Sequence, residues 1–346
     1  MKRIELGRTG IKVPNWCLGT MTWGRQTDEA DGHRQIDMAL ERGIDFLDTA
    51  EMYPVNPPKA ETVGDTETII GNWIRKTGRR DEMTIATKML GPSEMVRNGA
   101  PITPDALRAA LDGSLRRLGT DRVDLYQLHW PNRGSYHFRQ IWEYDPTGQD
   151  RVAAQDHFAE IMSALKDLAA AGKIRAFGLS NDTAWGVCQW QKAAEAQGGP
   201  RVATIQNEYS LLCRHFDSDL AEACHHEEVT LLAYSPLACG LLSGKYGDGV
   251  IPEGSRRSIN PELNGRVTDR LAPALDAYLD IARRYGIDPV HMAFAWVTTR
   301  PVPSIPIFGA TTVQQMEHAL DGLETEIPDD VLAEIEAAHR AHPMPF

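Results

Sequence analysis

The sequence predicts an α/β protein folded as a single (β/α)8 TIM barrel over residues 1–346. Eight short apolar runs alternate with longer stretches of helical periodicity, a pattern typical of a parallel sheet. No Pro/Gly/Ser-rich linker divides the chain, and 346 residues is an ordinary length for such a barrel. An open, doubly wound sheet is the alternative. It would be expected to carry G-x-G-x-x-G after an early strand, and the sequence has no such motif.

The elements begin with a small hairpin, because Arg3–Leu6 and Ile11–Val13 flank the turn sequence GRTG. Short apolar runs predict the eight barrel strands: Trp16–Leu18, Ile44–Leu47, Met83–Thr87, Val123–Leu128, Ile174–Leu179, Val202–Ile205, Thr230–Tyr234 and Ser304–Ile307. Helical periodicity predicts ten helices: Asp28–Arg42, Thr66–Thr77, Thr103–Leu118, His157–Ala171, Thr183–Ala196, Leu220–His226, Pro273–Tyr285, Pro289–Thr299, Thr312–Leu320 and Asp329–His339. Pro104 suits a first helical position, and Gly78 and Gly172 suit helix ends.

Two long segments interrupt the alternation, and we expect both at the C-terminal rim of the barrel, where loops form pockets. Residues 131–156 show no sustained periodicity and are predicted to be an inserted loop. Its aromatic residues are Tyr136, Phe138, Trp142 and Tyr144. They indicate a lid or pocket wall, and a surface loop packed by its own aromatic side chains is the alternative. Residues 235–270 form the second long loop.

The amino-acid composition argues against several classes of binding partner and cellular location. The formal net charge of -12 argues against a nucleic-acid groove or an anionic membrane surface, although it leaves room for a local basic pocket. The five cysteines are odd in number and form no C-x-x-C pair, which indicates free thiols in a reducing compartment. The first residues, MKRIELGRTG, lack the apolar stretch of a signal peptide. We therefore expect a cytoplasmic protein with no membrane or nucleic-acid partner.

The residues that follow the ends of the predicted strands are mostly polar. They are Thr20, Asp48 with Tyr53, Lys88, His129 with Trp130, Ser180 and Asn181, Gln206, Tyr234 and Ser235, and Gly309 to Thr311. Because parallel strands end on the same rim, these residues are expected to surround one pocket.

Four of these residues, Asp48, Tyr53, Lys88 and His129, suit carbonyl chemistry. A free tyrosine has a pKa near 10, and an adjacent ammonium group such as Lys88 is expected to lower it. Asp48 can hold Lys88 as a buried partner, and His129 can donate a hydrogen bond to a substrate oxygen. Tyr53 would then exchange the proton on oxygen while hydride moves at carbon. Taken singly, each has a plainer explanation: a salt bridge, a core histidine or a packing tyrosine.

The sequence resembles the aldo-keto reductases over essentially its whole length. The matching stretches are GIDFLDTAEMY, TIATK, VDLYQLHWP, IRAFGLSN, IQNEYSLL, LLAYSPLACGLLSGKY, IPEGSR and GATTVQQM. The resemblance is strongest to the bacterial Tas-type branch, near the group that includes potassium-channel β subunits. It implies an NADP(H)-dependent reductase of small carbonyl compounds, with the tetrad Asp48, Tyr53, Lys88 and His129 and with Tyr53 as the general acid.

The same resemblance implies cofactor contacts. Tyr234 would stack on the nicotinamide, while Ser180, Asn181 and Gln206 would bind the carboxamide. The full implied set is Thr20, Met21, Asp48, Ser180, Asn181, Gln206, Tyr234, Ser235, Pro236, Leu237, Ala238, Cys239, Lys245, Arg256, Gly309, Thr311 and Gln315. Substrate contacts would come from Trp23, Tyr53, His129 and Trp130. Related reductases often have Glu-Asn after Gln315, where this chain has His318 and Ala319.

Other functions stay open from the sequence. A metal-dependent barrel hydrolase usually shows an early H-x-H or clustered carboxylates, and neither is present. Cys224, His225 and His226 diverge on a short helix, so no metal site is predicted. A non-catalytic, NADPH-binding regulatory or redox-sensing protein is the rival, because channel-associated relatives keep the same tetrad. Neither the physiological substrate nor the oligomeric state is predicted.

Overall fold

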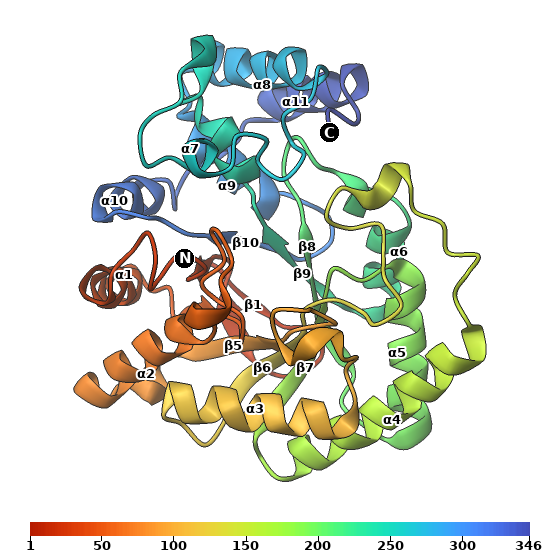
Figure 1. The fold of residues 1–346 in the computed structure, drawn as a ribbon. Helices are drawn as coiled ribbons and strands as arrows, with labels where there is room; N and C mark the ends of the chain where they lie inside the picture. Colours follow the sequence, from red (N-terminus) through yellow and green to blue (C-terminus); the bar gives the residue numbers. More distant parts are fainter.

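A computed structural model describes residues 1–346, apart from the side chain of Asp248, and contains a closed barrel of eight parallel strands (Figure 1). Neighbours around the barrel follow the order β10-β3-β4-β5-β6-β7-β8-β9. The strands are β3 (Cys17–Gly19), β4 (Phe46–Asp48), β5 (Thr84–Met89), β6 (Val123–Leu128), β7 (Ile174–Ser180), β8 (Val202–Glu208), β9 (Thr230–Tyr234) and β10 (Ser304–Phe308). The predicted (β/α)8 barrel is therefore confirmed.

The predicted N-terminal hairpin is also present, as β1 (Arg3–Glu5) paired antiparallel with β2 (Lys12–Pro14). Its apolar side chains Leu6, Ile11 and Val13 are buried in one cluster with residues from inside the barrel. The barrel residues of this cluster are Cys17, Phe46, Ala86, Leu125, Ala176, Ala203, Leu232 and Ile305. The hairpin thus closes the end of the barrel at which the strands begin.

Helices surround the barrel and pack on it through a second, larger apolar cluster (Figure 1). They are α1 (Glu29–Glu41), α2 (Asp65–Thr77), α3 (Pro104–Leu118), α4 (Arg151–Ala170), α5 (Ala184–Gln197), α6 (Asp219–Glu227), α7 (Arg256–Ile259), α8 (Leu271–Tyr285), α9 (Pro289–Thr298), α10 (Val313–Asp321) and α11 (Asp329–Ala341). Local signals explain several ends. Thr103 caps α3 ahead of Pro104, and Gly78 and Gly119 adopt left-handed conformations after α2 and α3.

Two predicted loops are shorter or more regular than expected. Helix α4 begins at Arg151 because the Asp150 side chain accepts hydrogen bonds from the first backbone N–H groups, so the inserted loop ends near residue 150 rather than 156. The segment 235–270 contains a 3-10 helix at Ala238–Ser243 and the short helix α7, and α8 begins two residues earlier than predicted.

Strand alternation arranges the barrel interior in layers. Phe46, Ala86 and Leu125 lie in the apolar cluster beside the hairpin. Two residues further along the same strands are Asp48, Lys88 and Gln127, and Lys88 pairs in register with Gln127. Because side chains two residues apart share a face of a strand, each polar residue points into the barrel above an apolar one. The polar layer lies toward the ends of the strands.

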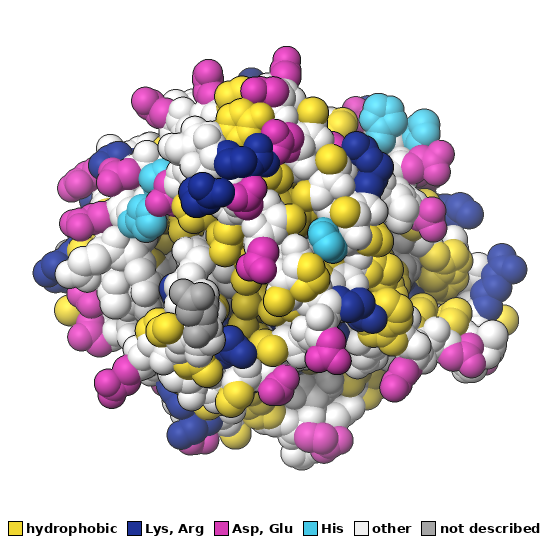
Figure 2. Space-filling view, turned by 90° about the horizontal axis from the view of Figure 1, so that it is seen from above, with side chains coloured by type: hydrophobic (Ala, Val, Ile, Leu, Met, Phe, Trp, Pro, Cys, Tyr) yellow, Lys and Arg dark blue, Asp and Glu magenta, His cyan; other side chains and the backbone are white. Residues whose placement is uncertain are grey.

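No helix among the described residues is both long enough and apolar enough to cross a membrane. All five cysteines are free thiols. Figure 2 shows acidic and basic side chains interspersed with hydrophobic ones on the face seen from above, without a broad basic stripe on that face.

Close packing of α2 on α3 gives a test of the fold. A Cβ atom added at Gly71 would lie 2.1 Å from the backbone oxygen of Arg117, which cannot move without shifting α3. We expect Gly71→Ala to reduce the free energy of unfolding by about 1–3 kcal/mol. Gly113→Ala is the matched control, since its Cβ would meet only the flexible ends of the Arg116 and Arg117 side chains. Chemical denaturation of both variants measures the difference, and equal stabilities would contradict this packing.

Candidate active site

Lys88 lies at the centre of the polar layer and is completely buried. Its ammonium donates to Asp48 Oδ2 at 2.6 Å, to the backbone oxygen of Thr49 at 2.9 Å and to Tyr53 Oη at 3.4 Å. Burial lowers the pKa of Lys88, but the carboxylate charge of Asp48, the interaction with Tyr53 and the hydrogen bonds to both residues outweigh burial, so the pKa of Lys88 is raised. Lys88 therefore stays charged inside the barrel.

Two glutamines hold the carboxylate of Asp48. Gln206 Nε2 donates to Asp48 Oδ1 at 2.8 Å, and Gln127 Nε2 reaches the same oxygen at 3.2 Å. With Lys88 on Oδ2, both carboxylate oxygens are occupied. Gln127 was not among the site residues expected from the sequence. Its position two residues after Leu125 on β6 was the signal, because alternate residues of a strand share a face and Leu125 lies inside the barrel.

Tyr53 is 8% exposed as a residue, whereas Lys88 beside it is completely buried. Burial raises the pKa of the Tyr53 phenol more than the nearby Lys88 lowers it, and the net shift is upward. The expected net lowering by Lys88 is thus not found in this structure. Lys88 donates to Tyr53 Oη, which leaves the phenol hydrogen free to be donated elsewhere. The arrangement is that of a neutral hydroxyl acid.

His129 lies beside Tyr53, with ring centroids 5.8 Å apart. Burial, with a smaller effect from the positive charge of Lys88, holds the pKa of His129 well below its ordinary value. The ring is therefore a neutral imidazole at physiological pH. Its buried Nδ1 has no hydrogen-bond partner among the described residues, while Asn181 Nδ2 donates to the backbone oxygen of His129 at 3.0 Å.

Aromatic side chains connect His129 with the inserted loop. The ring of Trp130 lies 5.1 Å from His129 and 5.7 Å from Phe138, and its indole nitrogen donates to the backbone oxygen of Pro92. A Cβ at Gly91 would lie 2.1 Å from the Trp130 ring, so the indole lies directly on the backbone there. Trp130 and Phe138 form an apolar wall next to Tyr53 and His129.

Trp23, which was expected to contact the substrate, does not form part of this wall. Its side chain is 0% exposed, its indole nitrogen donates to Gln35 of α1, and its ring lies against Gly32 and Ile69. Trp23 therefore packs between the first loop and helices α1 and α2. It does not face a pocket in this structure, because the indole fills the space that Gly32 leaves.

The resemblance implies that Ser180, Asn181 and Tyr234 contact the nicotinamide of the cofactor. In this structure these side chains form hydrogen bonds with one another. Tyr234 Oη donates to Asn181 Oδ1 at 2.8 Å, and Asn181 Nδ2 donates to Ser180 Oγ at 3.0 Å. Thr20 Oγ1 donates to the backbone oxygen of Asp48. Burial, with a smaller effect from Glu208, raises the pKa of Tyr234 well above its ordinary value, so it stays a neutral donor. This network continues into the group around Lys88.

A basic loop follows β9. Lys245, Arg256 and Arg257 form no ion pair with any carboxylate among the described side chains, and Lys245 and Arg257 lie over the ring of Tyr246. Gly240 adopts a φ of 91°, and a Cβ there would lie 2.9 Å from Lys245 Nζ. Ser235, Ala238 and Cys239 also have positive φ.

The other residues that the resemblance assigns to the cofactor differ in exposure. Met21, Leu237 and Thr311 are partly exposed, Pro236 is buried, and Gly309 and Gln315 are exposed.

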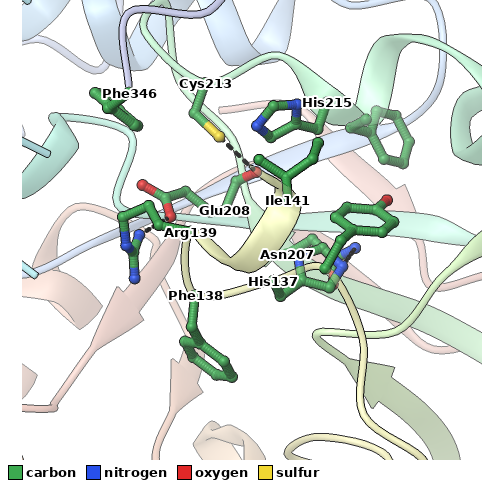
Figure 3. Close-up of a pocket in the computed structure, with 11 residues that line it drawn as sticks. His137, Phe138, Arg139, Ile141, Asn207, Glu208, Cys213, His215 and Phe346 are labelled. Atoms are coloured by element: carbon green, nitrogen blue, oxygen red, sulfur yellow. Dashed lines mark hydrogen bonds and ion pairs between the residues drawn. The ribbon is translucent and has the colours of Figure 1, made fainter. Parts of the chain in front are cut away.

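A pocket lies between the inserted loop and the end of β8 (Figure 3). Arg139 from the loop donates to Glu208 Oε2 at 2.5 Å, and Arg266 donates to Oε1 at 2.8 Å. Tyr136 and Phe138 line the pocket, Tyr136 also packs on Tyr144 of the same loop, and Trp142 is 56% exposed beneath Arg270. Glu208 thus joins the inserted loop to the segment that follows the basic loop. No local pattern predicts this triad, because its three members are far apart in the chain.

The chain is similar in sequence to known proteins over nearly its whole length. A family model described as the aldo/keto reductase family matches residues 15–340. Protein tas of Escherichia coli is 42% identical over 100% of this chain and 99% of its own. The uncharacterized oxidoreductase YrpG of Bacillus subtilis is 32% identical over 96% of this chain and 94% of its own. The aldo-keto reductase yakc [NADP(+)] of Schizosaccharomyces pombe is 28% identical over 93% and 86%.

The buried Glu208 triad generates a prediction. Burial raises the pKa of Glu208, but the positive charges of Arg266 and Arg139 and their hydrogen bonds lower it by more than burial raises it. The net pKa therefore lies below the ordinary value of 4.5. The triad therefore stabilises the fold above about pH 4.5, and this contribution is lost as the pH falls through the folded pKa. We expect Glu208→Gln to cost about 3–5 kcal/mol at pH 7, because two arginines lose their charged partner.

Urea denaturation at pH 7 and near pH 3.5 measures this effect, and the difference from the unchanged protein should shrink at the lower pH. Glu82→Gln is the control, since Glu82 pairs with Arg79 at the exposed surface. A pH-independent loss on Glu208→Gln would show that packing, rather than charge, carries the effect.

Proposed function

The chain belongs to the aldo/keto reductase family, and on that premise we propose that this oxidoreductase reduces an aldehyde or ketone to an alcohol with NADPH. One observation carries the proposal. A buried ammonium, Lys88, lies between a held carboxylate, Asp48, and a neutral phenol, Tyr53, and a neutral imidazole lies next to that phenol.

Tyr53 is the proposed proton donor. As hydride reaches the carbonyl carbon, negative charge develops on the carbonyl oxygen, and the Tyr53 hydroxyl gives its proton to that oxygen. The phenolate left on Tyr53 Oη is stabilised by the ammonium of Lys88, which Asp48 keeps charged. His129, as a neutral N–H donor, orients the carbonyl oxygen toward Tyr53. Lys88 and Asp48 thus act through Tyr53 rather than on the substrate.

The donor set suits a dinucleotide phosphate. When bound, the reduced nicotinamide supplies the hydride. Asn181, Gln206 and Tyr234 would hold its carboxamide and ring, because they lie beside the tetrad and carry amide and hydroxyl groups. Lys245 and Arg256 would hold phosphates, since neither has a carboxylate partner among the described side chains and arginine is suited to bidentate phosphate contacts. Thr311 and Gln315, joined by two hydrogen bonds at the start of α10, lie on the proposed adenine side.

The proposed substrate is an apolar or aromatic carbonyl compound. Trp130 and Phe138 present aromatic surface beside Tyr53 and His129, and Trp23 is excluded from this wall by its burial. Apolar surface favours apolar ligands through the hydrophobic effect.

Tyr53→Phe tests the mechanism. The change removes the hydroxyl and keeps the ring, so NADPH binding should stay nearly unchanged while carbonyl reduction falls by about 10²- to 10⁴-fold. NADPH oxidation with a panel of aldehydes, ketones and quinones measures the rate, and cofactor fluorescence measures binding. Tyr278→Phe is the matched control, because this buried tyrosine lies on α8 and its hydroxyl has no partner among the described residues.

The outcome also separates the enzyme from its rival, a non-catalytic NADPH-binding regulator. A regulator would bind NADPH and turn over no member of the panel, with or without the Tyr53 hydroxyl. Near-full activity in Tyr53→Phe would instead assign the proton to another donor.

Arg256→Ala tests the choice of cofactor. NADPH differs from NADH by one phosphate, and a guanidinium is suited to bind it. We expect the loss of Arg256 to weaken NADPH binding by about 1–3 kcal/mol and to leave NADH binding almost unchanged. Fluorescence titration with both cofactors measures this, with Arg283→Ala on the exposed face of α8 as the control. Equal losses for both cofactors would assign Arg256 to the shared pyrophosphate.

A further inference from the structure

Three potential metal ligands meet where two outer helices approach each other, away from the group around Lys88. Asp288 and His291 come from the start of α9, and His318 comes from α10. One ring nitrogen from each histidine and one carboxylate oxygen lie within 4.8 Å of one another. We propose that Asp288, His291 and His318 form a site for a first-row divalent transition metal such as Zn²⁺, which cross-links α9 to α10. The proposal does not depend on the proposed function.

The chemistry of the ligands selects this class of metal. Two imidazoles and one carboxylate suit Zn²⁺, Ni²⁺ and Co²⁺, whereas Mg²⁺ and Ca²⁺ prefer oxygen ligands alone. Ligands around a tetrahedral Zn²⁺ at 2.0–2.1 Å are separated by about 3.4 Å. His318 is 48% exposed, so its side chain has room to rotate by the small amount that closes the group when a metal replaces its hydrogen bond to Asp288. Water would take the fourth position.

Hydrogen bonds already orient two of the three ligands. Asp288 Oδ1 accepts from the backbone N–H groups of Val290 and His291, which caps α9, and Oδ2 is hydrogen-bonded to His318 Nε2 at 3.0 Å, a contact that the metal ion would replace. His291 Nε2 donates to the backbone oxygen of His318 at 2.7 Å, because a carbonyl only accepts. Nδ1 of His291 therefore keeps its lone pair. Metal-binding histidines commonly use their second nitrogen in this way.

Packing also fixes the His291 ring. A Cβ added at Gly322, which follows α10, would lie 2.5 Å from Cδ2 of His291. The imidazole thus lies directly on the glycine backbone, with the His318 ring centroid 4.9 Å away. A hydrogen-bonded carboxyl group and a pre-oriented imidazole therefore lie together before a metal binds.

Calorimetric titration of the full chain, dialysed against chelator, tests the site with ZnCl₂ as the probe. We expect one Zn²⁺ per chain to bind saturably at this site and MgCl₂ to give no comparable binding. His318→Ala should reduce the Zn²⁺ affinity at least tenfold. Asp288→Asn should do the same, and asparagine still caps α9, so loss of binding cannot be ascribed to loss of the helix.

His226→Ala is the matched control, since His225 and His226 are also adjacent, exposed histidines but lie on α6. The Zn²⁺ affinity of the His226→Ala variant should equal that of the unchanged protein. The thermal unfolding midpoint gives a second measurement: Zn²⁺ should raise it in the unchanged protein and in His226→Ala, but not in His318→Ala or Asp288→Asn. Circular dichroism without metal checks that all variants are folded.

Two outcomes would overturn the proposal. One is the absence of saturable Zn²⁺ binding by the unchanged protein. The other is binding that His318→Ala and Asp288→Asn leave intact, which would assign the metal to another group, such as the partly exposed thiols Cys188 and Cys239. Co²⁺ spectra separate these cases, because thiolate ligands give charge-transfer bands and the proposed oxygen and nitrogen ligands do not.

Discussion

A lysine without access to water is the constraint on which the rest of this barrel depends. The ammonium of Lys88 is fully buried, and a buried charge is costly unless it is paired and hydrogen-bonded. Asp48 supplies the opposite charge, and that carboxylate in turn requires the amides of Gln127 and Gln206. Four neighbouring or facing strands thus each contribute one polar side chain to a single network. Tyr53 and His129 lie at its edge, where burial keeps both rings neutral.

Much of this could be predicted from the sequence, because it follows from local patterns. Strand alternation and helical periodicity gave the barrel and its order, and residue type at the strand ends gave Asp48, Lys88 and His129 as neighbours. Parallel strands bring their ends together whatever the loops do. The register then places side chains such as Lys88 and Gln127 side by side.

The remaining features depend on contacts that local patterns do not contain. Trp23 follows a strand end, as a pocket residue would, yet it is buried because Gly32 of α1 leaves room for its indole. Glu208 lies 69 residues from Arg139 and 58 from Arg266, so no window of sequence shows the triad. The start of α4 was missed for a smaller reason, since Asp150 ends a segment with weak periodicity and only its capping hydrogen bonds reveal the helix.

The hairpin at the start of the chain has a consequence for how such a protein can diversify. Leu6, Ile11 and Val13 complete the core from the end opposite the loops, so stability there does not depend on the rim. Natural variation can therefore lengthen, shorten or reshape the loops at the rim while the hairpin end stays the same. Substitutions in the hairpin would weaken the fold without touching the ligand side of the barrel. Substitutions in exposed rim loops can alter ligand preference at little cost, whereas buried rim pairs such as Glu208 with Arg139 and Arg266 limit that freedom.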